Sequence, residues 1–158
     1  MMIPFENLVT AHGARVLRVC RAVLGPGPDA EDAWSETFLA ALQAWPTADQ
    51  TTDAAGWLVT IAHRKALDIV RARARHAVPM AELPERGHTP AQRDLDLWAA
   101  VAALPEKQRH AVALHHLGGL AHAEVARLLG GTAEAARRAC ADGIRNLRRA
   151  MREEDDHA

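Results

Sequence analysis

Arginine side chains near the C-terminal end of the chain offer the clearest chemistry. They are Arg137, Arg138, Arg145, Arg148, Arg149 and Arg152. Apolar residues recur among them at steps of three and four, which places the apolar set on one helical face and leaves the arginines off it. This apolar set is Ala136, Cys140, Ile144, Leu147 and Met151. Guanidinium groups on the outer face of a helix can bind phosphates and base edges, so the pattern predicts DNA binding.

The elements in front of these arginines have the order of a helix-turn-helix. Three helical segments are expected between Leu104 and Met151, separated by glycine pairs at 118–119 and 130–131. Thr132 follows the second pair and is expected to cap the final helix. A short helix, a glycine turn and a second helix with a basic outer face present cations to the DNA major groove.

The middle of the final helix departs from this pattern at Ala141, Asp142 and Gly143. An exposed aspartate repels phosphates, and a glycine inside a helix costs about 1 kcal/mol relative to alanine. Asp142 lies four residues after Arg138 and three before Arg145, so it could restrain these arginines. It could equally accept a hydrogen bond from a cytosine amino group.

A second basic helix is expected from about Trp57 to Arg75. Its apolar stripe consists of Leu58, Ile61, Ala62, Ala66, Ile69 and Val70. The other side presents Arg64, Asp68, Arg71 and Arg75 at helical spacing, flanked by His63 and Lys65. Asp68 lies four residues from Arg64 and three from Arg71, so we expect it to pair with these arginines and orient them.

Histidines in the rear half raise the question of a metal site. They are His110, His115, His116 and His122. His115 and His116 are adjacent and should point in different directions on a helix, and no cysteine or carboxylate is expected to complete a ligand set. Cys140 is expected to be a small core residue. The sequence therefore predicts no metal and no cofactor.

Motifs of catalysis are missing from the sequence as well. No Ser-His-Asp order, no glycine loop that cradles phosphates and no recognisable pair of acids occurs. We therefore expect a protein that is not an enzyme and has no small-molecule substrate. An alternative hypothesis is a small metal-dependent enzyme that uses the histidines. Stoichiometric zinc in the purified protein would support it.

Composition indicates an all-α protein. Of the 158 residues 49% are hydrophobic and only 4% aromatic, with no tyrosine, so alanine and leucine must do most of the packing. The two cysteines, Cys20 and Cys140, lie far apart and fit a reducing compartment. No run of 18 apolar residues and no export leader is present, so a cytoplasmic protein without membrane contact is expected.

Charge is distributed unevenly along the chain, although the formal net charge is only -1. Residues 1–60 carry 3 basic and 7 acidic side chains, whereas residues 95–152 carry 9 and 5. An acidic front and a basic rear predict two surfaces for two partners, a protein and DNA. We expect two small helical domains at 1–76 and 93–152, joined by a short linker at 77–92 and followed by an acidic, frayed tail at 153–158.

Three segments in the same order resemble the extracytoplasmic-function (ECF) group of bacterial sigma-70 factors. DAEDAWSETFLAALQAW, from Asp29, is similar to the segment that binds core RNA polymerase. GWLVTIAHRKALDIVRARAR, from Gly56, is similar to the helix that melts the promoter and reads the minus-ten element. LPEKQRHAVALHHLGGLAHAEVARLLGGTAEAARR, from Leu104, resembles the domain that reads the minus-thirty-five element. The first segment has Ser35 where the family usually has glutamine.

This resemblance implies a sigma factor with region 2-like and region 4-like domains. Core polymerase would be bound by Asp32, Ser35, Glu36 and Phe38. The minus-ten element would be bound by Asp53, His63, Arg64, Lys65, Asp68, Arg71 and Arg75. The minus-thirty-five element would be bound by Thr132, Glu134, Arg137, Arg138, Arg145 and Arg148. Implied partners are bacterial RNA polymerase core enzyme, promoter DNA and an anti-sigma factor.

A different class of protein could share the rear half. This alternative is a free-standing helix-turn-helix regulator, or a degenerate sigma-like adaptor, that binds DNA or polymerase without supporting initiation. Run-off transcription with core polymerase separates the two hypotheses, because only a sigma factor yields a promoter-specific transcript.

Overall fold

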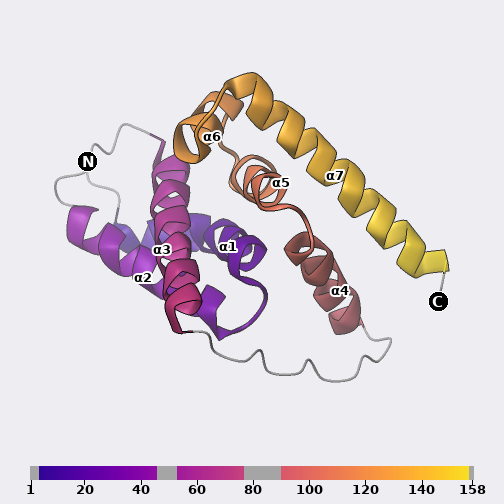
Figure 1. Ribbon diagram of the computed structural model, residues 1–158. Coiled ribbons are helices and arrows are strands. Elements are labelled where there is room, and N and C mark those ends of the chain that lie inside the picture. The colour runs from indigo at the N-terminus through magenta and orange to yellow at the C-terminus, as the bar shows by residue number, and fades with distance from the viewer. Residues whose placement is uncertain (1–3, 46–52, 77–89, 157–158) are drawn as a thin grey trace.

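The computed structural model describes residues 4–45, 53–76 and 90–156, and over these ranges the chain is helical with no strand. The helices are α1 (Phe5–Leu24), α2 (Pro28–Ala44), α3 (Ala54–His76), α4 (Pro90–Ala102), α5 (Glu106–Ala111), the π-helix η2 (Val112–Leu117), α6 (His122–Leu129) and α7 (Ala133–Asp156). Figure 1 shows α1, α2 and α3 gathered on one side and α7 extending as a long arm on the other. The predicted all-α fold is confirmed.

Helices α1, α2 and α3 pack against one another around a core of small and branched side chains. Helix α1 ends because Gly25 adopts φ 89, a left-handed conformation that glycine reaches at little cost, and its N–H donates to the Arg21 carbonyl. Pro28 then occupies the first turn of α2, where its missing N–H costs nothing. Ala33 and Ala41 are fully buried and let α2 approach its neighbours closely.

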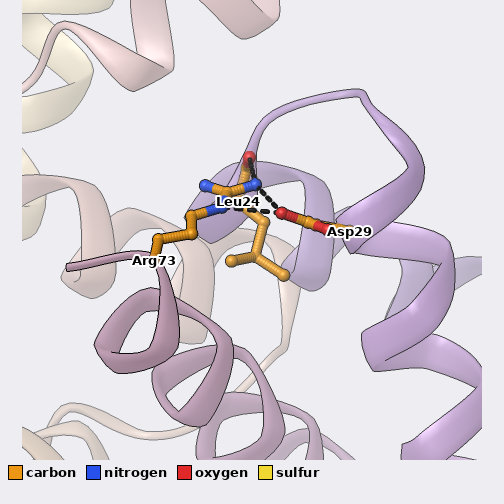
Figure 2. Close-up of polar contacts among 3 residues, drawn as sticks. All are labelled: Leu24, Asp29 and Arg73. Carbon is orange, nitrogen blue, oxygen red and sulfur yellow. Dashed lines mark hydrogen bonds and ion pairs between the residues drawn. The ribbon is translucent and has the colours of Figure 1, made fainter. Parts of the chain in front are cut away.

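Asp29, in the first turn of α2, joins this helix to the end of α3 (Figure 2). The Arg73 Nε donates to Asp29 Oδ2 at 2.6 Å, and a terminal guanidinium nitrogen of Arg73 donates to the Leu24 carbonyl at 3.3 Å. One guanidinium thus ties the last residue of α1 and the first turn of α2 to α3. Planar, forked donors suit such a double contact.

The rear half places α7 against both α5 and α6. Gly143 makes this packing possible, because a Cβ there would lie 2.7 Å from Val112 Cγ2 and 3.3 Å from the Gln108 carbonyl oxygen. Three residues further along α7, Asn146 Nδ2 donates to Gln108 Oε1 at 2.8 Å. The glycine that weakens the helix pattern in the sequence therefore lies where α7 packs tightly against α5 and the start of η2.

Replacing Gly143 by valine is expected to lower the free energy of unfolding by about 2 kcal/mol, because the added side chain overpacks this contact. Urea unfolding measures the change. Ala141→Val, on the exposed side of the same helix, adds similar bulk and is the matched control. Equal effects of the two substitutions would contradict the packing role of Gly143.

The acidic end of the chain is more ordered than expected. Helix α7 continues to Asp156, so residues 153–156 are helical and not a frayed tail. Glu153 follows Arg149 by four residues and Asp156 follows Arg152 by four, a spacing at which opposite charges stabilise a helix by about 0.3 kcal/mol per pair. The expected linker at 77–92 lies outside the described residues, except for its last three residues, which belong to α4.

The two halves pack directly against each other, and a single buried cluster runs through both. A Cβ on Gly118 would lie 2.7 Å from Val59 Cγ1 of α3, and one on Gly56 would lie 3.4 Å from a methyl group of Leu120. Glycines therefore let α3 meet the loop that follows η2. Among the described residues, no helix is long and apolar enough to cross a membrane.

Candidate nucleic-acid and polymerase interfaces

One side of α2 is exposed and acidic. Asp32, Ser35 and Glu36 all face solvent, at the spacing of one helical face. Leu39 and Leu42 continue this face and are 57% and 50% exposed. We call these five residues the α2 face. Both leucines lie off the buried stripe of α2, which includes Ala33, Phe38 and Ala41, and neither is among the residues predicted for this site.

Phe38 was wrongly predicted on the polymerase-binding surface. Its side chain is 5% exposed and lies in the core, with ring centroids 4.7 Å from Trp34 and 6.4 Å from Phe5. Trp34 is itself held by a 2.9 Å hydrogen bond from its Nε1 to the Gly13 carbonyl of α1. Phe38 therefore supports the α2 face from behind and offers no surface to a partner.

Helix α3 exposes most of the residues predicted to bind the minus-ten element. Arg64, Asp68, Arg71 and Arg75 are exposed, Lys65 is half-buried, and Asp53 is exposed just before the helix begins. Asp68 pairs with Arg71 at 3.6 Å, one of the two arginines that its spacing predicted as partners. Both partners are largely solvated, so this pair orients Arg71 more than it stabilises the fold.

His63 is buried in this structure, apart from the exposed residues of α3. It is 3% exposed, and its Nε2 lies 2.9 Å from Nδ1 of His110, itself 4% exposed on α5. Desolvation, together with the charge of His110 at His63 and of Arg109 at His110, lowers the pKa of each histidine to about 4. The neutral pair forms a hydrogen bond between the two halves of the molecule.

Helix α7 presents the residues predicted to bind the minus-thirty-five element. Thr132 caps the helix, since its Oγ1 accepts a hydrogen bond from the Ala135 N–H at 3.1 Å. The exposed side chains are Glu134, Arg137, Arg138, Arg145 and Arg148. Asp142 forms an ion pair with Arg145 at 3.2 Å. Of the two roles considered for Asp142, the structure therefore shows the restraint of this arginine.

Three of these arginines border one open groove of about 740 Å³ along α7, namely Arg137, Arg145 and Arg148. Glu134 and Arg138 are not among the residues that line it. The groove also contains His115, His116, His122 and Cys140. A positively charged groove of this kind attracts polyanions such as DNA.

Cys140 does complete a cluster with His115 and His116, contrary to the expectation from the sequence. One potential ligand atom from each of these residues lies within 4.8 Å of the others. The chain around His115 is π-helical and not α-helical as expected, and the Gly118 N–H donates to the Ala113 carbonyl five residues back.

Two family models match the chain, one over each half. The model "Sigma-70 region 2" matches residues 8–76, which hold α1, α2 and α3. The model "Sigma-70, region 4" matches residues 94–152, which hold the helix-turn-helix of α6 and α7. The α2 face and the basic side of α3 thus lie within region 2, and the arginines of α7 lie within region 4.

Curated relatives include two ECF RNA polymerase sigma factors. SigE of Mycolicibacterium smegmatis is 32% identical over 140 residues, covering 82% of this chain and 54% of that protein. BldN of Streptomyces coelicolor is 34% identical over 137 residues, covering 80% of this chain and 52% of that protein. The chain thus spans about half the length of the curated relatives it matches.

Solved structures with the same fold include the sigma factor RpoE of Bartonella quintana, in complex with the anti-sigma factor NepR. It has a TM-score of 0.75 at 18% identity and covers 94% of this chain and 96% of that one. CnrH, solved with the cytosolic domain of CnrY, has a TM-score of 0.68 at 22% identity, with 94% and 88% covered. With both halves matched in order by the family models, and with these relatives, the chain belongs to the ECF group of the sigma-70 family.

Proposed function

We propose that this protein is an ECF sigma factor that binds core RNA polymerase, directs it to promoters and helps open the duplex. The observation that carries the proposal is the placement of three surfaces on one chain: an acidic α2 face, a basic side of α3 and a basic α7, each within the matched region 2 or region 4. A free-standing helix-turn-helix regulator would need only the last of them, so this alternative is not favoured.

The roles of the surfaces follow from their chemistry. The α2 face offers carboxylates and two exposed leucines to a protein surface that is basic and partly apolar, as a polymerase coiled coil can be. The basic side of α3 can bind single-stranded DNA, where a cationic groove offsets the few kcal/mol that unstacking a base costs. Arginines at the start of α7 are positioned to enter the major groove. Nothing in these roles requires covalent chemistry from the chain, so we infer a non-catalytic subunit that acts in the cytoplasm.

Run-off transcription tests the proposal. The purified chain is added to core polymerase with a library of promoter fragments, and promoter-specific transcripts are sequenced. The proposal predicts transcripts that depend on the chain. Binding to DNA without any such transcript would refute it and would favour the regulator or the degenerate adaptor. An anti-sigma partner is part of the same proposal, since the neighbour RpoE was solved with one.

Substitution of Arg137 and Arg138 by alanine is expected to weaken binding to upstream promoter DNA by about 10-fold to 100-fold and to flatten its salt dependence, because two cations near phosphates or bases are lost. Fluorescence anisotropy at several salt concentrations measures both effects. Affinity for core polymerase should be unchanged. Arg18→Ala with Arg127→Ala removes two exposed arginines elsewhere and is the matched control.

A further inference from the structure

The cluster of His115, His116 and Cys140 lies in the groove along α7, but none of its residues is among those assigned to DNA or polymerase binding. Its residues come from the end of η2 and the middle of α7, 24 or more residues apart in the chain. His116 Nδ1 lies 3.7 Å from Cys140 Sγ, and one ligand atom from each of the three residues lies within 4.8 Å of the others. Ligands of a tetrahedral zinc ion are about 3.5 Å apart, given Zn–N and Zn–S bonds of about 2.0 and 2.3 Å.

The π-helix explains why neighbouring histidines can serve one centre. An i to i+5 hydrogen-bonding pattern widens the turn, so adjacent side chains diverge less than they do on an α-helix. The ring centroids of His115 and His116 are 5.7 Å apart, and both residues line the groove that contains Cys140. Such π-helical turns occur frequently at functional sites.

His115 is held in the tautomer that a metal requires. Its Nδ1 lies 2.7 Å from the Leu120 carbonyl oxygen, which can only accept, so Nδ1 carries the proton and Nε2 carries the free lone pair. A backbone carbonyl that fixes the other ring nitrogen is the usual support of a metal-binding histidine. Leu120 is itself buried, so this contact is well defined.

His122 supports the same site from α6. Its ring stacks on His115 with centroids 3.8 Å apart, and its Nδ1 is buried without a hydrogen-bond partner in the described part of the chain. An unpartnered ring nitrogen beside the cluster is a candidate for the fourth coordination position.

We propose that His115, His116 and Cys140 bind one zinc ion, with the fourth position taken by water or by His122. Nitrogen and sulfur donors without a carboxylate suit zinc and disfavour magnesium and calcium. The thiolate of Cys140 would offset one of the two positive charges of the zinc ion. Glu153 and Asp156 add two carboxylates to the groove that the arginines line.

A zinc ion at this position would link η2 to the recognition helix α7. Cys140 is only two residues from Arg138 and three from Arg137, so the ion would fix the part of α7 that carries the DNA-binding arginines. This inference goes beyond the proposed function and does not depend on it, because the site is built from side chains within one half of the molecule.

Cobalt titration of the metal-free full chain tests the proposal. Co²⁺ bound to a thiolate gives a charge-transfer band in the near ultraviolet, and four-coordinate Co²⁺ gives strong visible bands. We expect both at one ion per chain, loss of both on addition of Zn²⁺, and a rise in the thermal midpoint with Zn²⁺. Cys140→Ala should remove the charge-transfer band and weaken binding at least 100-fold.

His116→Gln keeps the test decisive if Cys140→Ala fails to fold, because His116 is exposed and its loss should leave the fold intact. It should weaken Co²⁺ binding at least 10-fold. Matched controls are Cys20→Ala, which removes the other thiol in α1, and His76→Gln, which removes an exposed histidine of α3. Absence of the thiolate band in the unaltered chain, or equal Co²⁺ affinity in His116→Gln and His76→Gln, would overturn the proposal.

Discussion

Acidification from about pH 7.5 to about pH 5 is expected to lower the free energy of unfolding by about 3 to 4 kcal/mol, through His63 and His110. Both are buried, and the folded molecule holds the pKa of each at about 4, against 6.5 for a histidine in water. Below pH 6.5 the unfolded chain therefore binds protons that the folded chain does not. Each histidine changes the free energy of unfolding by up to about 1.4 kcal/mol per pH unit. Its stabilising contribution is fully present above the pKa of 6.5 in the unfolded chain and is lost as the pH falls toward 4.

Protonation is expected to separate the two halves before either of them unfolds. The hydrogen bond between His63 Nε2 and His110 Nδ1 needs one donor and one acceptor, and an added proton turns the acceptor into a second donor. Opening the contact between α3 and α5 hydrates both rings while leaving each helical half intact. Small-angle scattering at pH 7.5 and pH 5 should show an increase in the radius of gyration with no loss of helical circular dichroism.

The double substitution His63→Leu with His110→Leu is the control for this prediction. Two apolar residues of similar size avoid leaving one buried polar group unpaired. Urea unfolding of the double variant should show a slope against pH that is smaller by about 2 kcal/mol per unit between pH 5 and pH 6. An unchanged slope would assign the pH dependence to other groups.

Reversal of charge on the α2 face, by Asp32→Arg with Glu36→Arg, is expected to weaken binding to core polymerase by about 100-fold, which is about 2.7 kcal/mol. Both side chains are exposed and neither forms an ion pair in the described residues, so the change should not affect folding. Adding Leu39→Ala and Leu42→Ala should weaken polymerase binding further. The exposed apolar surface of both leucines is expected to be buried only in the complex with polymerase.

Surface plasmon resonance with immobilised core enzyme measures this loss. The control Glu6→Arg with Asp94→Arg makes the same change in charge at exposed positions on α1 and α4. A loss of affinity in the control equal to that in the α2 variant would indicate long-range electrostatics and not a docking face. Full affinity in the α2 variant would mean that polymerase binds another surface.

Periodicity predicted the helices well, because apolar residues at steps of three and four must face a core whatever lies opposite. It failed where burial depends on a distant partner. His63 falls among the exposed residues of α3 by position, yet it is covered by His110, 47 residues away. Phe38 illustrates the converse, since family resemblance assigned to the surface a residue that the apolar stripe places inside.

Local geometry accounts for the other differences. The cluster at His115, His116 and Cys140 could not be predicted, since the argument against it assumed an α-helical turn that the chain does not adopt. The packing role of Gly143 could not be predicted from the sequence of α7, because the residue that it packs against, Val112, lies in a distant segment of the chain. Charges with a partner in the same helix were predictable, as Asp68 with Arg71 shows, whereas Arg73 with Asp29 was not.

Contact between the halves has a consequence for how strongly the protein can bind a promoter. In the proposed function, the α3 and α7 surfaces bind two separate promoter elements, so the two halves must be free to place each surface on its own element. Contacts at His63 and Gly118 hold the halves in one arrangement, and opening these contacts costs free energy before both elements can be bound. If this arrangement is favoured by about 2 kcal/mol, only about one molecule in 30 is competent, and every measured affinity for holoenzyme assembly is lowered by that factor. Loosening this contact should thus make the sigma factor a tighter binder without altering any residue that touches polymerase or DNA.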